Sequence, residues 1–245
     1  MKAIKYFALS VAVILISAQS FAFVPQPTPT VSGSTGVIRM PSADVIPYKN
    51  MNFGLDCGPV AFIDKWTLLY KMNIGTFQGM ELGCVGANDM VKDQLKDGVY
   101  INMKYSLASD NSPYPLLLAI GVENLTSQTL SDVYMVATRY LPNGSRLHFG
   151  FVGDFVTSDI VESRFRPLGA LGYDSPMFGE RIYGLIDMFA GEHVFQLDIG
   201  LRWYFSDTVA FNMTGINILS DKNTPIDNYR DPKAVLIGIS WINPL

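Results

Sequence analysis

The stretch Phe-Gln-Leu-Asp-Ile-Gly-Leu-Arg-Trp-Tyr-Phe, residues 195–205, decides the fold. Its odd-numbered positions all carry large apolar side chains, whereas its even-numbered positions carry polar residues, a glycine and a tyrosine. Successive side chains point to opposite faces of a β-strand, so the pattern predicts a strand with one apolar face. At about 3.3 Å per residue the stretch reaches about 36 Å, which is longer than most strands of soluble proteins and enough to cross a bilayer with tilt.

The same alternation recurs along the chain and predicts about twelve strands. The expected ranges are 51–58, 65–74, 79–86, 99–107, 115–123, 131–141, 146–154, 164–173, 181–190, 194–205, 208–217 and 234–242. Short intervals follow the even strands, as at 142–145, and long intervals follow several odd strands, as at 219–233. This arrangement is typical of bacterial outer-membrane barrels, which have short turns at one end and long loops at the other. We therefore expect an all-β fold, an antiparallel transmembrane β-barrel of about 12 strands with a short N-terminal segment.

Residues 1–22 have the features of a secretory signal peptide. Lys2 and Lys5 precede an apolar run, and Ser20 and Ala22 supply the small residues of a cleavage site. The apolar run is shorter than a membrane-spanning helix requires. We expect cleavage after Ala22 and export to the outer membrane of a bacterium with two membranes. The remaining chain divides into a Pro- and Gly-rich periplasmic or plug-like segment over 23–50 and the barrel over 51–245.

The composition argues against several classes of function. The chain has 245 residues, of which 49% are hydrophobic and 16% charged, and its formal net charge is -4. No basic cluster is present to bind a phosphate backbone, so we expect no nucleic-acid partner. No second run of 18 apolar residues follows the signal segment, which excludes a helical membrane bundle. The sequence has no Gly-x-Ser-x-Gly or His-Glu-x-x-His motif and only two histidines, so we expect no catalytic residue, no metal site and no cofactor.

Aromatic residues gather at one end of the expected barrel. In barrels of this kind, lipid-facing aromatic side chains concentrate at the membrane interfaces, where a polar ring edge stays in contact with water. Six aromatic residues fall at the periplasmic ends of even-numbered strands and are assigned the outward parity of aliphatic residues such as Val136 and Ile199. They are Tyr105, Tyr140, Tyr173, Trp203, Phe205 and Trp241. We interpret them as an interface girdle.

The opposite face of the strands carries charges of both signs. The charged residues expected in the lumen include Lys71, Glu81, Lys104, Glu123, Arg139, Asp187, Asp198 and Arg202. An unpaired buried ion is costly, so in a narrow lumen these groups should pair with one another. We expect Arg139 and Arg202 in particular to meet carboxylates on neighbouring strands. The set is either a structural network or the lining of a polar passage.

Two short stretches resemble a known family. Residues 33–43, Gly-Ser-Thr-Gly-Val-Ile-Arg-Met-Pro-Ser-Ala, resemble the Gly-x-x-Gly-Leu-x-x-x-Pro-Thr-Ala opening of the YjbH family, with Val37 and Ser42 in place of Leu and Thr. Residues 199–205 resemble the Gly-Leu-Arg-Tyr-Tyr strand of the same family. The resemblance implies a single minimal unit of an outer-membrane β-barrel linked to exopolysaccharide export.

The expected function is therefore that of an outer-membrane barrel with an envelope-structural role, or one that passes a polar solute or glycan. Expected partners are outer-membrane lipid, the barrel-insertion machinery, and polysaccharide or envelope proteins. Two alternatives stay open. An outer-membrane lipid-modifying hydrolase would need His148 or His193 to meet a serine at the lipid face. A secreted soluble β-sandwich or adhesin would bury its apolar strand faces between two sheets.

Overall fold

The computed structural model describes residues 23, 25–60, 65–77, 79–88, 98–109, 112–127, 130–156, 164–192, 194–220 and 233–244. The predicted signal segment and His193 lie outside these residues. The strands are β1 (Asn50–Val60), β2 (Lys65–Phe77), β3 (Met80–Asn88), β4 (Val99–Ser109), β5 (Leu116–Glu123), β6 (Leu130–Tyr140), β7 (Arg146–Val156), β8 (Arg164–Pro176), β9 (Ile182–Gly191), β10 (Val194–Tyr204), β11 (Val209–Ser220) and β12 (Ala234–Pro244). Within the described residues, no helix is both long and apolar enough to span a membrane.

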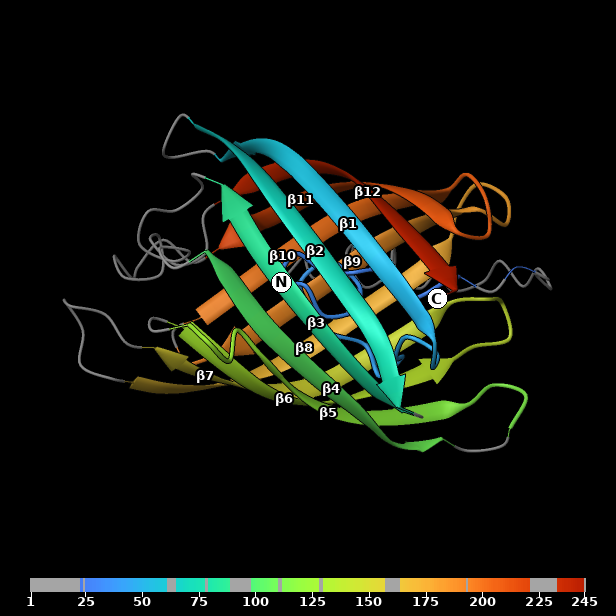
Figure 1. The fold of residues 1–245 in the computed structure, drawn as a ribbon, viewed down its shortest axis with the longest axis horizontal. Coiled ribbons are helices and arrows are strands. Elements are labelled where there is room, and N and C mark those ends of the chain that lie inside the picture. The colour runs from blue at the N-terminus through green and yellow to red at the C-terminus, as the bar shows by residue number, and fades with distance from the viewer. Residues whose placement is uncertain are drawn as a thin grey trace, which may run out of the picture.

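The twelve strands form one closed antiparallel barrel (Figure 1). Each strand pairs with its neighbours in the chain, and β1 pairs with β12 from Asn50 opposite Pro244 to Val60 opposite Ala234. Closure leaves no sheet edge with unpaired N–H and C=O groups, which is the condition for crossing lipid with β-strands. The predicted fold class, an antiparallel barrel of about 12 strands, is confirmed.

The strand boundaries follow the predicted ranges closely. β2, β8 and β11 run three residues beyond their predicted ends, to Phe77, Pro176 and Ser220. In β2 the alternation breaks at Gly75, where the ladder with β3 shifts register between Gly75 and Phe77 and then continues. A break in the side-chain pattern therefore marked an irregularity within the strand and not its end.

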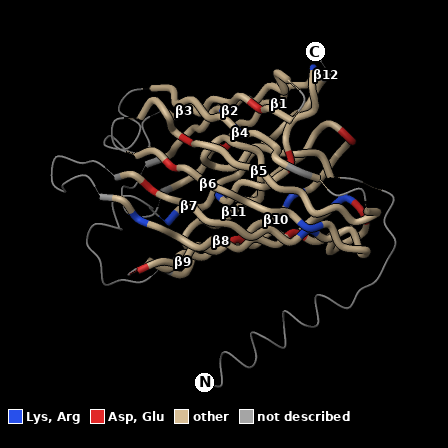
Figure 2. The backbone as a smooth tube through the Cα atoms, turned by 90° about the horizontal axis from the view of Figure 1, so that it is seen from below, with Lys and Arg blue, Asp and Glu red and all other residues tan. Residues whose placement is uncertain are grey.

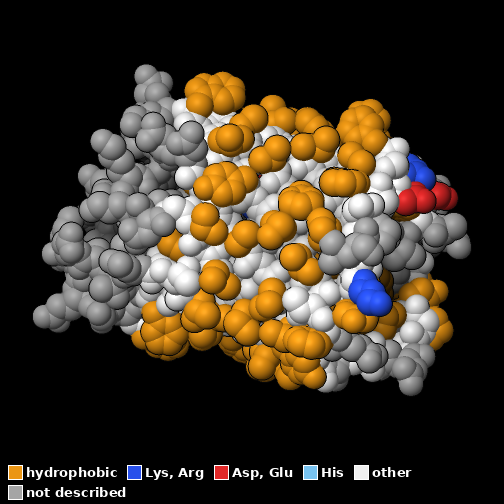
Figure 3. All heavy atoms as spheres, viewed as in Figure 1, with side chains coloured by type: hydrophobic (Ala, Val, Ile, Leu, Met, Phe, Trp, Pro, Cys, Tyr) orange, Lys and Arg blue, Asp and Glu red, His pale blue; other side chains and the backbone are white. Residues whose placement is uncertain are grey.

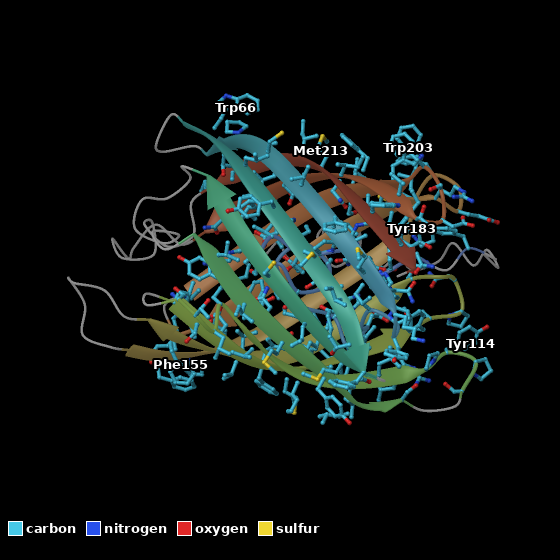
Figure 4. The ribbon with its side chains drawn as sticks, in the orientation of Figure 1. Trp66, Tyr114, Phe155, Tyr183, Trp203 and Met213 are labelled. Atoms are coloured by element: carbon cyan, nitrogen blue, oxygen red, sulfur yellow. The ribbon has the colours of Figure 1, made fainter. Side chains whose placement is uncertain are left out.

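The outer face of the barrel is a belt of exposed apolar side chains (Figure 3). In β10, Ile199 and Trp203 are exposed, whereas Asp198 and Arg202, which each come one residue earlier, are buried. Figure 4 places Trp66 and Phe155 toward one end of the barrel and Trp203 and Tyr114 toward the other. A continuous apolar surface flanked by aromatic residues suits lipid and not water. The closed barrel differs from the two packed sheets that the sandwich alternative requires.

Five of the six aromatic residues assigned to the interface stand at outward positions. Tyr105, Trp203, Phe205 and Trp241 are between 44% and 52% exposed. Tyr173 shares the outward parity of its strand, and its hydroxyl donates to Ser145 Oγ at 3.1 Å.

On β6 the sequence-based assignment of faces is wrong. Met135 is 52% exposed, whereas Val136 and Thr138 are buried, so the even-numbered residues of this strand face the lumen. Tyr140 therefore points inward and does not belong to the girdle, and Arg139 stands at the outward parity and not in the lumen.

The cause of this error is that part of the lumen is packed with apolar side chains. Val136 and Tyr134 belong to a buried cluster that includes Met40 and Ala43, two residues that precede the first strand. An apolar residue on β6 therefore does not mark the lipid face, because the N-terminal part of the chain supplies a second apolar environment inside the barrel.

Substituting arginine for Ile239, an outward residue near the middle of β12, is expected to lower the free energy of unfolding by roughly 2–4 kcal/mol, because the cation then lies near the bilayer midplane. The same change at Val235, an outward residue near the end of that strand, is expected to cost less than about 1 kcal/mol. Reversible urea unfolding in lipid vesicles measures both losses. Equal losses at the two positions would contradict the proposed depth of β12 in the membrane.

Candidate functional site

Residues 25–46, which we call the lumenal segment, lie inside the barrel (Figure 1). The segment bends back on itself through two antiparallel bridges, between Pro29 and Thr35 and between Gly36 and Pro41. Five of its apolar side chains are no more than 2% exposed: Val37, Ile38, Met40, Ala43 and Ile46. The lumen therefore holds a compact piece of irregular chain. Some of its backbone amides bond to carbonyls of the segment itself, as from Val31 to Ile38, and the other backbone polar groups need partners in the wall.

Three asparagines of the wall bind backbone carbonyls of the lumenal segment. Asn52 on β1 donates to the carbonyl oxygen of Pro27 at 3.1 Å. Asn73 on β2 donates to that of Gly33 at 2.7 Å, and Asn102 on β4 donates to that of Ser32 at 2.9 Å. Each asparagine occupies an inward position, so the polar face of the strands matches the carbonyls of the segment.

Glu81 and Lys104 stand opposite each other on β3 and β4 and hold the middle of the segment. Glu81 accepts hydrogen bonds from the Thr35 amide at 3.0 Å, the Thr35 hydroxyl at 2.7 Å and the Ile46 amide at 3.0 Å. Lys104 donates to the carbonyl oxygens of Thr35 at 2.9 Å and Ser42 at 3.2 Å. Its Nζ lies 3.6 Å from Glu81 Oε1. Both charges are buried and compensate each other.

Asp187 on β9 receives three consecutive backbone amides of the segment. Its Oδ2 accepts from Ile38 at 3.0 Å, from Arg39 at 2.8 Å and from Met40 at 2.8 Å. Successive amides turned toward one anion form a concave anion site. On the neighbouring strand Asp198 binds Arg39 through Nε at 2.6 Å and Nη2 at 3.0 Å. Two carboxylates thus fix this turn: the Arg39 cation pairs with Asp198, and three backbone amides bind Asp187.

A third group of charges lies at the end of the barrel where β7 begins. Arg146 binds Asp174 on β8 through Nε at 3.0 Å and Nη2 at 2.8 Å, and it reaches Asp44 of the lumenal segment through Nη1 at 3.2 Å. Tyr140 donates to the other oxygen of Asp44 at 2.6 Å. The sequence analysis missed Arg146, Asp174 and Asp44. The inward parity that Arg146 and Asp174 share with His148 was the signal that could have found the first two.

His148 is fully buried beside this group. Its Nε2 lies 3.3 Å from Asp174 Oδ2, and its Nδ1 lies 2.9 Å from Thr138 Oγ1. Thr138 accepts from the Ala43 amide at 2.8 Å, so we assign its own proton to the bond with Nδ1 and the imidazole proton to Nε2. His148 thus faces the lumen beneath the segment and does not reach the lipid face that a lipid hydrolase would need.

The remaining lumen charges differ in their partners. Lys71 forms an ion pair with Asp56 on the neighbouring strand. Arg202 does not meet the carboxylates expected from the sequence, because its Nε donates to Asn212 Oδ1 at 2.7 Å and its Nη2 donates to the Val37 carbonyl oxygen at 2.8 Å. The sequence analysis considered only the strands and therefore assigned acidic partners to Arg202. The lumenal segment supplies a backbone carbonyl as the acceptor instead.

A hollow remains at the end of the lumen opposite the start of β1 and the end of β12. It holds about 550 Å³ of space not filled by protein atoms, including space open to solvent. We call it the outer hollow, because Asn124 and Leu130, which flank the connection from β5 to β6, lie on its edge. The charged and aromatic residues that line it include Arg39, Glu123, Asp132, Asp154, Arg166 and Phe189. In the part of the chain that the structure describes, no three His, Cys, Asp or Glu side chains are grouped as metal ligands would be.

Comparison with known proteins identifies the fold alone. No protein-family model matches the chain, and no curated protein matches it. Among solved structures the chain is similar to one described as a KdgM porin, with a TM-score of 0.53 and 8% sequence identity, over 78% of this chain and 98% of that one. The chain therefore shares the β-barrel fold of that structure.

The buried pair of Glu81 and Lys104 provides a test of the lumenal network. Glu81→Gln and Lys104→Met are each expected to lower the free energy of unfolding by roughly 3–5 kcal/mol, because each leaves its partner charge buried without compensation. The double variant is expected to lose clearly less than the sum of the two single losses. Denaturant unfolding in lipid vesicles measures all three variants.

The matched control for this double-mutant cycle is the exposed pair of Arg181, before β9, and Asp207, between β10 and β11, which are 2.9 Å apart. The coupling free energy between these two side chains is expected to stay below about 1 kcal/mol, because water screens both charges. Additive losses at Glu81 and Lys104 would show that their charges do not stabilise each other.

Proposed function

We propose that this protein is an outer-membrane barrel that passes a polar solute or glycan and is closed at rest by its own lumenal segment. The observation that carries the proposal is the seating of residues 25–46 inside the barrel, where polar and charged side chains of the wall bind its backbone. The porin-like architecture supports it at the level of the fold.

The first argument is that the barrel does not need the segment to close. The ladder between β1 and β12 completes the sheet, and strands bond to strands around the whole ring. The contacts to Asn73, Glu81 and Asp187 use wall side chains and not the strand backbone. The segment could therefore leave while every hydrogen bond of the barrel sheet remained.

The second argument concerns the wall that the segment covers. Its buried inward positions include Asn52, Asn73, Asn102, Thr138 and Asn212. If the segment left, these side chains would replace their hydrogen bonds to the segment with hydrogen bonds to water. The net cost in free energy is small, because a typical hydrogen bond contributes only about 1 kcal/mol net to stability. A lumen freed of the segment would then offer these polar side chains to water, beside the apolar side chains of the two buried clusters, and a polar solute would pass along the polar part.

The nature of the solute is proposed from resemblance. The YjbH-like stretches at 33–43 and 199–205 favour a glycan of the exopolysaccharide class. Residues 33–43 form the central part of the lumenal segment, so the resemblance falls on the element that would control passage.

A permanently closed barrel with an envelope-structural role is the second candidate. Its support is the close fixation of the turn at 38–40, where Asp187 binds three amides and Asp198 binds Arg39. In this case the segment is part of the folded core, and opening would accompany unfolding.

Conductance in a planar bilayer distinguishes the two candidates. The mature protein is expected to show little steady conductance, interrupted by rare openings, whereas deletion of residues 23–47 is expected to give a stable open channel. Asp207→Asn, an exposed change at a turn, is the control and should behave like the unaltered protein. An intact protein that never opens, together with a deletion variant that does not fold, would support the structural role. Steady porin-like conductance of the intact protein would contradict closure.

We also propose that the protein is exported through a cleaved signal peptide and inserted into outer-membrane lipid by the barrel-insertion machinery. In a bacterium with two membranes it is expected in the outer-membrane fraction, beginning after Ala22, and in solution only with detergent. Fractionation followed by N-terminal sequencing measures both. Recovery in the soluble fraction without detergent would contradict the membrane location.

A further inference from the structure

The guanidinium group of Arg39 is held by two side chains of the wall. Its Nε lies 2.6 Å from Asp198 Oδ2 and its Nη2 lies 3.0 Å from Asp198 Oδ1, so one carboxylate receives two N–H groups of the same guanidinium. The guanidinium carbon lies 5.3 Å from the centre of the Phe189 ring. A carboxylate that accepts two parallel N–H groups and an aromatic face suit a planar guanidinium better than a compact ammonium.

Asp198 is also fixed by a contact within the wall. The ladder between β10 and β11 shifts register between Leu197 and Ile199, on either side of Asp198. On β11 this irregularity includes Asn217, which has a φ of 56° and whose amide donates to Asp198 Oδ1 at 2.5 Å. A bulge of this kind re-aims a side chain. Because the bond does not involve the lumenal segment, we expect the carboxylate to keep its position when Arg39 is removed.

Asp198 differs from other paired carboxylates of the wall in the source of its cation. Acidic and basic positions both occur on the strands (Figure 2), and four carboxylates pair with a cation on a neighbouring strand: Asp56 with Lys71, Glu81 with Lys104, Asp154 with Arg166 and Asp174 with Arg146. The cation that pairs with Asp198 belongs to the lumenal segment. Release of the segment would leave those four pairs intact and would withdraw the Arg39 cation from Asp198.

Arg39 stands between Asp198 and the outer hollow. Arg39 and Phe189 line the hollow, and the Arg39 side chain is 11% exposed. Asp198 is fully buried. A solute in the hollow therefore meets the guanidinium first, and it reaches the carboxylate when Arg39 withdraws.

We propose that Asp198 and Phe189 form a binding site for an alkylguanidinium group, which Arg39 fills in the closed barrel and which a small solute with the same group fills in its place. Asp187 lies directly opposite Asp198 and adds a second acidic group beside the site. The solute and Arg39 exclude each other, so the solute binds better when the segment is displaced and thereby favours opening. This effect on opening rests on the proposed function, whereas the site itself does not.

Chemical rescue of Arg39→Ala tests the site. Ethylguanidinium has the side-chain atoms that this substitution removes, and ethylurea has a similar planar shape without the charge. In the full mature protein in zwitterionic micelles, Arg39→Ala is expected to lower the thermal unfolding temperature. Millimolar ethylguanidinium should restore at least half of that loss in a saturable way, and ethylurea should restore none. When Asp198→Asn is added to Arg39→Ala, ethylguanidinium should also restore none.

Refolding yield is the second measurement. If Arg39→Ala does not fold alone, ethylguanidinium is expected to raise its refolding yield severalfold, whereas ethylurea is not. Arg181→Ala is the matched control, because exposed Arg181 lies 2.9 Å from Asp207 and 5.0 Å from the centre of the Phe23 ring. Water surrounds that pair, so neither probe should change the stability of Arg181→Ala. Equal effects of the two probes on Arg39→Ala, no rescue by ethylguanidinium, or rescue that persists with Asp198→Asn would each overturn the site.

The opening frequency of the unaltered protein in a planar bilayer tests the effect on closure. Ethylguanidinium is expected to raise this frequency at least twofold, and ethylurea is expected to leave it unchanged. Rescue of Arg39→Ala without any change in opening frequency would overturn the link to closure while the site stands. A protein that never opens would overturn the proposed passage, and the rescue experiment would still decide the site.

Discussion

The constraint on which this structure depends is that polar groups removed from water must find partners within the chain. The barrel meets it for the strands by joining β1 to β12, so that no edge faces lipid. The lumenal segment has no such ladder with the wall. Some of its amides bond to carbonyls within the segment, and others of its backbone groups bond to wall side chains, among them Asn73, Glu81 and Asp187. The charges of the lumen are therefore best understood through the segment they hold and not through the barrel alone.

The compact path of that segment needs glycine at two positions. A Cβ on Gly36 would stand 2.2 Å from the Met40 carbonyl oxygen, inside the bridge between Gly36 and Pro41. A Cβ on Gly75 would stand 2.1 Å from the Pro47 carbonyl oxygen, where the chain leaves the lumen and passes over β2. Both distances are far below van der Waals contact, so only a residue without a side chain allows the segment to fold on itself and then to enter β1.

The sequence was sufficient to predict the fold, because the alternation of apolar and polar side chains along a strand depends only on neighbouring residues. The alternation in 195–205 and its counterparts determined strand number and position, and the even count implied closure. The lumen was harder to predict because its contacts join residues far apart in the chain. Val136 looks lipid-facing by its chemistry, yet it packs in the same buried cluster as Met40. Arg202 seemed to need an acid, yet it binds the carbonyl of Val37. Pairings of this kind depend on the path of the segment, which has no periodicity to reveal it.

The lumenal segment also connects closure of the barrel with the outer hollow. Ser32, Arg39 and Pro41 all line that hollow, so its present shape exists only while the segment is seated. Arg39 is held at one side by Asp198 and packs over Phe189 at the other, which makes it part of both the fixation and the hollow. Displacement of the segment would therefore remove three of the residues that line the hollow and break the bond between Arg39 and Asp198 in the same step.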